Sequence, residues 1–233
     1  MHRGATTAGL ARERLRRQSM GMIRLVVVGG LARHAAAFAT AAQKPLPPKQ
    51  IILPVNELHP AMLKADDLMR SCEIKHTKGS GPGGQHRNKV QTAIVVTHTP
   101  TSLTGSASES RSQQSNLGNA IFRLRLRLAL KCRTGVVAAD DGVLPSVEPS
   151  ALWASRTQGG GKLAMNANHA DFPSILAEAL DCIWWQGEVK AASEALGVST
   201  SQMVKLLAKE PAALQLTNGL RASNGLPPLR PNK

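Results

Sequence analysis

The sequence predicts an α+β fold in which one long helix packs on a small mixed sheet, followed by a small helical unit. Short β-branched stretches lie on both sides of a glycine-rich segment, residues 78–89, and predict strands. A longer stretch with apolar residues at helical spacing, residues 112–133, predicts the long helix. Beyond residue 171, apolar stretches of helical period alternate with short turns, which predicts the helical unit.

Composition divides the chain into five segments. We expect a targeting segment, a linker, the α+β domain, a second linker, and a helical unit whose proline-rich end is loose. Their ranges, in the same order, are residues 1–44, 45–56, 57–133, 134–170 and 171–233.

The targeting segment is rich in arginine, and Glu13 is the one acidic residue among the first 50 residues. The arginines are spread among Ala, Leu, Val and small polar residues, as in a transit peptide. We therefore expect import into a mitochondrion, with a plastid as the alternative. A secretory signal, with Leu25–Val28 as a short apolar core, and a disordered basic arm are the competing interpretations.

The start of the α+β domain comes after a proline-rich stretch, which indicates a linker. Asp66 and Asp67 suit the first turn of a short helix over roughly residues 57–71. Three strands are predicted next: Cys72–His76 before the glycine-rich segment, then Thr92–Thr99, and Leu103–Ser108 after a turn.

The long helix contains a run, Phe122–Leu128, that alternates strictly between apolar residues and arginine. Alternation by itself favours a strand. We predict a helix because residues 112–133 exceed a usual strand in length and Ser112 can cap the first turn. One helical face would carry the apolar side chains Leu117, Ile121, Leu124 and Leu128. Arg123 and Arg127, one turn apart, would lie on another face.

The C-terminal part begins with a second linker rich in Gly, Ala, Pro and Ser, for which Leu152 and Trp153 are the candidate anchor. The stretch Val189–Leu207 has the pattern of a helix-turn-helix. Residues 134–233 hold eight Lys and Arg against nine acidic residues, whereas DNA-binding units are usually strongly basic. A packing or partner-docking module is therefore favoured over a DNA reader.

The positive charge is concentrated in two places. Residues 74–133 hold ten Lys and Arg against one acidic residue, a net charge of +9, and residues 1–50 carry +8. Because a basic surface attracts phosphate backbones, the α+β domain is expected to bind nucleic acid. A solvated basic surface that serves solubility alone is the alternative.

The glycine-rich segment ends on Gln85, and its glycines and proline exclude a helix or a strand. Such loops carry function more often than structure. The Gln85 side chain cannot act as a general base near neutral pH, but its amide donates and accepts hydrogen bonds. This chemistry suits the orientation of a water molecule and the stabilisation of an oxyanion at an activated ester.

Other kinds of site find little support in the sequence. The cysteines Cys72, Cys132 and Cys182 form no CxxC pair, which fits a reducing compartment without disulfides or zinc. His76, His86 and His98 share no metal-ligand spacing, and no nucleophile with a partner histidine is evident. We expect no metal, no cofactor and no membrane span.

The sequence Gly81-Pro82-Gly83-Gly84-Gln85, followed by His86, Asn88 and Lys89, resembles the catalytic loop of class 1 peptide-chain release factors and related ribosome-rescue proteins. Glu109-Ser110-Arg111-Ser112-Gln113, at the start of the basic helix, extends the resemblance over about residues 66–131. The family's loop enters the peptidyl-transferase centre of the ribosome. Its glutamine positions the water that hydrolyses the ester between peptide and tRNA.

The resemblance implies a role for individual residues. Gly83, Gly84 and Gln85 would be catalytic. Ribosomal RNA of the large subunit and peptidyl-tRNA would be the partners, as the positive charge suggests independently. The residues expected to contact RNA are Lys78, His86, Arg87, Asn88, Lys89, Arg111, Arg123 and Arg127.

Three departures from the family refine the expectation. Arg87 stands where many relatives have a smaller or apolar residue. Only a short segment precedes the loop, without a candidate for the stop-codon-reading domains, so we expect release of peptides without reading a codon. We also expect a monomer. Residues 211–233 hold only Arg221, Arg230 and Lys233 as bases, unlike the strongly basic tail of some rescue factors.

Two other hypotheses stay open. In the first, the chain is a non-catalytic protein of the large ribosomal subunit or an assembly factor for it. In the second, the helix-turn-helix makes the protein a DNA-binding regulator. DNA is the less expected partner because the C-terminal unit is close to neutral.

Overall fold

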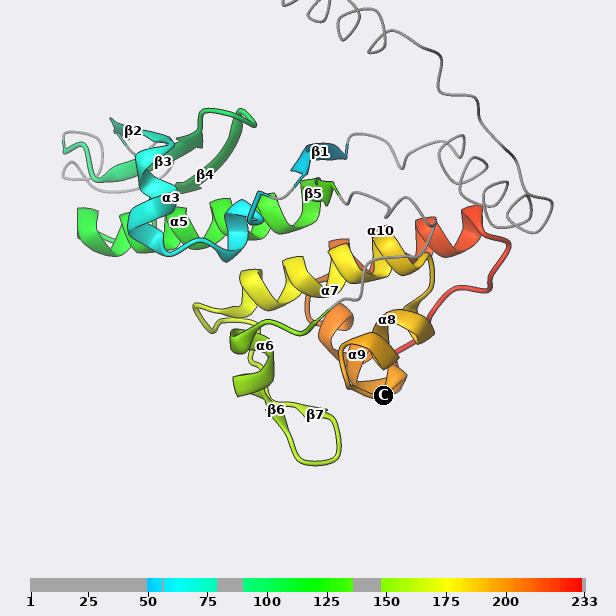
Figure 1. The fold of residues 1–233 in the computed structure, drawn as a ribbon. Coiled ribbons are helices and arrows are strands. Elements are labelled where there is room, and N and C mark those ends of the chain that lie inside the picture. Colours follow the sequence, from blue (N-terminus) through cyan, green and yellow to red (C-terminus); the bar gives the residue numbers. More distant parts are fainter. Residues whose placement is uncertain (1–49, 56, 79–89, 136–147, 232–233) are drawn as a thin grey trace, which may run out of the picture. The chain divides into compact units, whose positions relative to one another are not determined.

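In the computed structural model of the chain, the described residues are 50–55, 57–78, 90–135 and 148–231. The predicted targeting segment lies outside them. The sheet of the α+β domain has the strand order β2-β3-β4 (Figure 1). It is antiparallel throughout and not mixed as predicted, because each strand turns back beside the one before it. Its strands are β2 (Cys72–Thr77), β3 (Ala93–His98) and β4 (Leu103–Ala107), as the sequence predicted.

One long helix, α5 (Gln113–Lys131), packs on this sheet, which confirms the α+β fold class. The Ser112 side chain caps it by accepting a hydrogen bond from the Ser115 N–H, at 3.3 Å. This local bond, together with the length of the segment, outweighs the strand-like alternation of Phe122–Leu128.

Two opposite sides of α5 are covered. Residues two positions apart on an α-helix point about 200° away from each other. Leu124 and Leu128 are fully buried in a cluster with Ile94 and Val96 of the sheet. A different set packs against the core of the C-terminal helices: Phe122, Leu126 and Leu130. The alternation therefore reflects a helix placed between two layers.

The contact of β4 with α5 depends on Gly105, whose partner across the sheet is Val96. A Cβ at this position would lie 2.2 Å from the Ala120 carbonyl oxygen and 2.5 Å from the Leu124 nitrogen. Real Cβ atoms do not approach backbone so closely. The missing side chain thus allows the strand to lie directly on the helix backbone.

A strand that was not predicted is β1 (Ile51–Val55), inside the predicted linker 45–56. It pairs in parallel with β5 (Cys132–Gly135), the continuation of α5. The pairing joins residues about 80 positions apart, and local prolines gave no sign of it. The short helix predicted over 57–71 is present as two pieces, η1 (Pro60–Met62) and α3 (Ala65–Arg70).

The predicted linker 134–170 is wrong over its second half. It forms the helix α6 (Ala151–Arg156) and a hairpin of β6 (Thr157–Gln158) and β7 (Lys162–Leu163). The predicted anchor is confirmed: Trp153 is 1% exposed and donates through Nε1 to the Leu196 carbonyl, at 2.9 Å. The many small residues of this segment indicated a linker, but it folds because two large side chains, Trp153 and Met165, pack in the core of the C-terminal helices.

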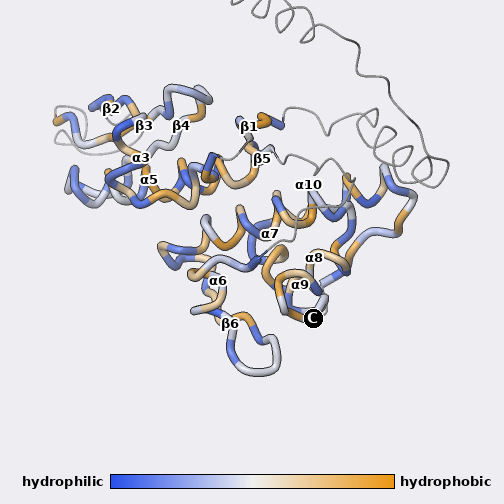
Figure 2. Tube along the Cα trace, in the orientation of Figure 1, coloured by the Kyte–Doolittle hydropathy of each residue, from blue (hydrophilic) through white to orange (hydrophobic). Residues whose placement is uncertain are grey.

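The helical unit contains α7 (Phe172–Gln186), α8 (Val189–Ala195), α9 (Thr200–Ala208) and α10 (Pro211–Ser223). Figure 2 shows hydrophobic residues recurring along α7, α8 and α9, which share one core with α6. The proline-rich end is not loose as far as Leu229. Its N–H donates to Asn218 Oδ1 at 2.7 Å, and its carbonyl accepts from Asn218 Nδ2 at 3.3 Å.

Polar contacts join the α+β domain to α7. Arg125 of α5 donates to the carbonyls of Ala61 and Leu63 and to Ser174 Oγ, at 2.9–3.1 Å. Thr134 of β5 donates to Asp181 Oδ2 at 2.7 Å. Burial raises the pKa of Asp181 to about 6, although the nearby Arg133 opposes this rise. The two predicted domains therefore share a buried seam.

His59 is buried and linked to β5. Its Nδ1 accepts from the Ala61 N–H at 3.0 Å, which leaves the proton on Nε2, 3.3 Å from the Cys132 carbonyl oxygen. Burial lowers the pKa of His59 to about 4, partly offset by this hydrogen bond. The ring is therefore neutral at physiological pH.

Replacing Gly105 with alanine is expected to lower the free energy of unfolding by about 3 kcal/mol, since the added methyl meets backbone atoms that cannot rotate away. The control is Gly118→Ala on the exposed side of α5, where a Cβ meets nothing within 4 Å. That change should stabilise by about 0.5–1 kcal/mol through helix propensity. Urea unfolding of both variants measures the effect, and a loss of equal size in both would contradict it.

His59 should make stability depend on pH. The unfolded chain binds more protons than the folded one between the pKa of about 6.5 for a free histidine and the folded pKa of about 4. Stability therefore falls as the pH is lowered through this range, by roughly 3 kcal/mol for this residue.

The comparison is with His59→Gln, which keeps one acceptor and one donor but does not titrate. Unfolding free energies from urea titrations at pH 7 and pH 4 should fall by roughly 3 kcal/mol more in the wild type than in the variant. Asp181 acts in the opposite direction in both proteins and cancels in the difference. Equal falls in both proteins would show that His59 is not responsible.

Candidate functional site

The predicted catalytic residues Gly83, Gly84 and Gln85, and the predicted RNA contacts His86–Lys89, lie outside the described residues. The residues that hold the ends of this segment are described. Thr77 of β2 and Ala93 of β3 are partners in the antiparallel ladder, so residues 78–92 connect two adjacent strand ends. Gln85 is the middle residue of that connection in sequence.

Asn116 holds the C-terminal end of the connection against the start of α5. Its Nδ2 donates to the Thr92 carbonyl at 2.7 Å and to the Ser110 carbonyl at 2.8 Å. Its Oδ1 accepts from the Ser110 N–H at 2.9 Å. The side chain is fully buried, so these bonds replace the water that its amide and the backbone groups have lost.

A glutamine side chain holds the same end of the connection. Gln113, at the start of α5, donates through Nε2 to the Gln91 carbonyl at 2.7 Å. Successive carbonyls before β3 are thus bound by side chains from the first turn of α5. Neither Asn116 nor Gln113 was singled out as a functional residue from the sequence. The signal available was a pair of amide side chains just after the N-cap Ser112, a position where they can reach a neighbouring backbone.

The structure places Arg123 and Arg127 along the outer edge of β4. Arg123 Nη1 donates to the Ser106 carbonyl and Arg127 Nη1 to the Thr104 carbonyl, both at 2.7 Å. The spacing matches, since four helical residues rise about 6 Å and two strand residues about 6.7 Å. Both guanidinium groups therefore satisfy backbone groups at a sheet edge, besides any role in RNA binding.

Arg123 also pairs with Glu109, with 2.6 Å between Nη1 and Oε1. The hydrogen bond from Arg123 lowers the pKa of Glu109. Because both side chains are about half exposed, the pair contributes little to stability and serves to hold the turn between β4 and α5.

Lys78 and Arg111, the other predicted contacts, are exposed and form no ion pair with any described residue. Lys78 comes directly after β2, at the start of the connection. Arg111 comes after Ser110, whose backbone Asn116 ties to Thr92. One cation therefore lies at each end of the glycine-rich connection, available for a ligand with negative charge.

None of the three cysteines, all within the described residues, is a candidate nucleophile. Burial raises the pKa of the Cys132 thiol to about 11 and that of Cys182 to about 12, so both are neutral and unreactive near pH 7. Burial also raises the pKa of Cys72. Within the same described ranges, no group of three His, Cys, Asp or Glu side chains could hold a metal ion.

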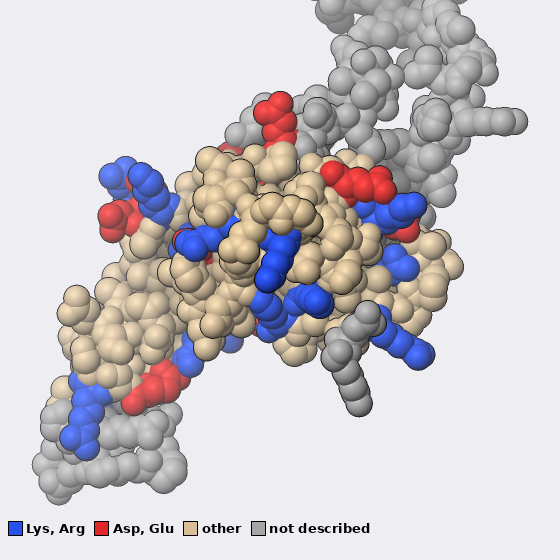
Figure 3. Space-filling model, turned by 90° about the horizontal axis from the view of Figure 1, so that it is seen from below, with Lys and Arg blue, Asp and Glu red and all other residues tan. Residues whose placement is uncertain are grey.

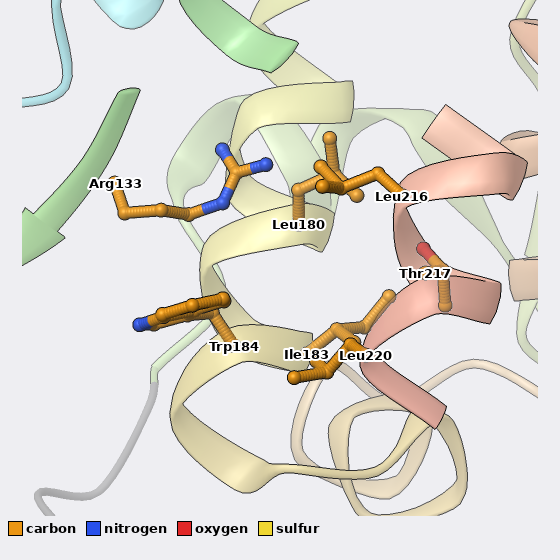
Figure 4. Close-up of a pocket in the computed structure, with 7 residues that line it drawn as sticks. All are labelled: Arg133, Leu180, Ile183, Trp184, Leu216, Thr217 and Leu220. Carbon is orange, nitrogen blue, oxygen red and sulfur yellow. The ribbon is translucent and has the colours of Figure 1, made fainter. Parts of the chain in front are cut away.

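A hollow between α7 and α10 is too small for a substrate. It has a volume of about 10 Å³, close to the space of one water molecule. Figure 4 shows its lining, in which the Arg133 guanidinium lies beside α7 and leucines of α7 and α10 face each other. No helix among the described residues has the length and apolar character needed to cross a bilayer.

Comparison with known proteins assigns this part of the chain to a known kind of domain. Residues 67–137 match the family model of the RF-1 domain. The chain therefore carries the Gly-Gly-Gln domain of the class 1 peptide-chain release factor family. No solved structure matches the chain.

Three curated relatives illustrate the similarity. The chloroplastic peptide chain release factor PrfB1 of Arabidopsis thaliana is 43% identical over 56 residues, which cover 24% of this chain and 12% of the relative. Peptide chain release factor 2 of Paramagnetospirillum magneticum is 31% identical over 107 residues, 46% of this chain and 26% of the relative. Peptide chain release factor 1 of Caldicellulosiruptor saccharolyticus is 38% identical over 77 residues, 33% of this chain and 21% of the relative. The chain thus spans about a quarter or less of each of these proteins.

Truncation of Asn116 to alanine is expected to lower the free energy of unfolding by about 2–3 kcal/mol, because partly buried backbone groups of Thr92 and Ser110 lose their partners. Gln113→Ala, which removes one exposed hydrogen bond, should cost less than about 1 kcal/mol. Urea unfolding compares the two, and amide exchange at Ser110 should speed up only in the Asn116 variant. Similar behaviour of both variants would show that Asn116 does not hold the connection.

Proposed function

We propose that this protein hydrolyses the ester of peptidyl-tRNA on the ribosome without reading a stop codon. The proposal rests on the way in which the structure holds the two ends of the glycine-rich connection, residues 78–92. Its ends leave adjacent strands, Asn116 and Gln113 tie its C-terminal end to α5, and Gln85 is its middle residue. A firm base supports the presentation of one amide side chain at a reaction centre.

The length of the connection supports the delivery of Gln85 to a site away from the domain. An extended chain covers at most about 3.3–3.6 Å per residue, so eight residues set an upper reach of about 26–29 Å. There the Gln85 amide and backbone N–H would orient a water molecule and bind the oxyanion of the tetrahedral intermediate. The tRNA sugar is a good leaving group, so the reaction needs no side-chain nucleophile.

Large-subunit ribosomal RNA and peptidyl-tRNA are the proposed partners, with the chain acting as a monomer. Lys78 and Arg111, exposed at the two ends of the connection, would contact phosphates together with His86, Arg87, Asn88 and Lys89. Arg123 and Arg127 would add charge along β4 while they hold its edge. The net charge of +9 over residues 74–133 supports this assignment.

The proposal of release without a codon draws on the fold of the residues beyond the family match. The match stops at residue 137, and the described residues after that position build the helices α6–α10. For the location, one relative is named as chloroplastic, and the arginine-rich first segment has the composition of a transit peptide. We therefore propose an organelle, with the mitochondrion before the plastid.

The experiment is single-turnover release of a labelled peptide from peptidyl-tRNA on purified ribosomes with an empty or sense-codon A site. Gln85→Ala should reduce the release rate by a factor of about 10²–10³, the usual effect of losing one oxyanion donor. Gln114→Ala, the same change at an exposed position of α5, should release like the wild type. Ribosome binding should be equal in all three proteins.

Two results would overturn the proposal. Full release by Gln85→Ala would exclude the glutamine mechanism. Absence of release by the wild type, combined with retention on large subunits through a high-salt wash, would instead favour a non-catalytic ribosomal protein.

A further inference from the structure

A second basic site lies on the helical unit, away from the glycine-rich connection in sequence. It is an open groove with a volume of about 150 Å³ beside α9. Figure 3 shows one face of the molecule, on which Lys and Arg side chains lie both in the middle and at the rim, and acidic ones lie nearer the rim. The groove is lined by Thr200, Ser201, Val204, Lys205 and Arg230.

Arg230 reaches this groove because the chain end is held in place. Asn218 of α10 binds both backbone groups of Leu229, and Arg221 Nε donates to the Pro227 carbonyl at 2.9 Å. The Leu229 side chain packs on the hydrophobic core of the helices. A cation that comes directly after such a clamp has lost part of its backbone freedom before any ligand binds, which lowers the entropic cost of binding.

Lys205 and Arg230 are both exposed, and neither forms an ion pair or hydrogen bond with a described residue. Among the described residues, no acidic side chain lines the groove, and α9 contains none. Two cations outside the groove are engaged within the protein: Arg156 of α6 pairs with Asp171, and Lys209 donates to the Met165 carbonyl. The groove therefore concentrates positive charge that the protein itself leaves uncompensated.

The lining fits a phosphodiester better than other ligands. Two cations and the hydroxyl groups of Thr200 and Ser201 can all donate to phosphate oxygens. Val204 is the one apolar side chain among the described lining residues, and none of these carries an aromatic ring on which a base could stack. The volume is also below the 300–1,000 Å³ typical of sites for drug-sized ligands.

We propose that this groove binds the phosphate backbone of ribosomal RNA and gives the protein a second, sequence-independent contact with the ribosome. The choice of RNA rests on the proposed function. A contact made only to phosphates positions the protein without reading bases. The helical unit would thus help to hold the α+β domain on the ribosome while the glycine-rich connection reaches the ester.

The test measures binding of the full-length protein to purified large-subunit ribosomal RNA over a range of salt concentrations. Lys205→Gln and Arg230→Gln should each weaken binding about fivefold at about 100 mM salt. Each should also reduce the slope of log K against log salt by about 0.7–0.9, the effect of one lost phosphate contact. Arg230→Lys keeps the charge and should keep the slope.

Two further variants distinguish an effect of the groove from an effect of the protein's net charge. Lys190→Gln removes one exposed cation from α8, outside the groove, and should leave the slope unchanged. Asn218→Ala frees the chain end and should weaken binding although both cations remain. Thermal unfolding of every variant verifies that the helical unit is folded.

The result of this RNA-binding test does not depend on the result of the peptide-release assay. Gln85→Ala leaves the groove intact and should bind this RNA like the wild type, so a failure of the release mechanism does not alter the result. Unchanged slopes for Lys205→Gln and Arg230→Gln would overturn the proposal. A short duplex DNA offers the same phosphates, so some loss of affinity for it is expected in both variants; tighter binding of the wild type to the duplex DNA than to the RNA at the same salt concentration would overturn the assignment to RNA and favour a DNA-binding role of the helical unit.

Discussion

The structure depends on the burial of α5 on two opposite sides. Leu124 and Leu128 face the sheet, where Gly105 brings the backbone of β4 against the helix, and Leu126 faces the core of the C-terminal helices. Arg125 fills a third side and donates to carbonyls around η1 and to Ser174 of α7. A helix held on three sides has little freedom to tilt, so whatever is attached to its first turn is held as firmly as the core itself.

The base of the glycine-rich connection is attached to that first turn. Asn116 and Gln113 extend the rigidity of α5 to the backbone just before β3. At its other end α5 runs into β5, which contacts α7 through Thr134 and Asp181. One helix therefore links the proposed catalytic loop to the helical unit that carries the proposed RNA groove. Binding energy gained at the groove can contribute to the positioning of Gln85 because the seam between them is packed and buried.

Much of this arrangement is predictable from the sequence, and the failures have physical causes. The strands around the connection and the cap at Ser112 are recognisable because their signals are local. Strand β1 was missed because its partner β5 is distant in sequence and a two-stranded parallel pair needs few residues. The second half of the segment 134–170 has the composition of a linker, yet it folds because Trp153 and Met165 pack against helices that come later in the chain. The roles of Arg123 and Arg127 at the edge of β4 depend on a match between helix and strand spacing that exists only once the two are packed.

The sequence by itself determined the family of the domain, the candidate catalytic residues and the concentration of positive charge, because these depend on residue identity and order. Only the tertiary structure decided which residues support them. It assigned Asn116 to the base of the connection, divided the alternating leucines of α5 between two layers, and brought Arg230 beside Lys205. Each of these depends on contacts between residues far apart in the chain, and such contacts leave no local pattern.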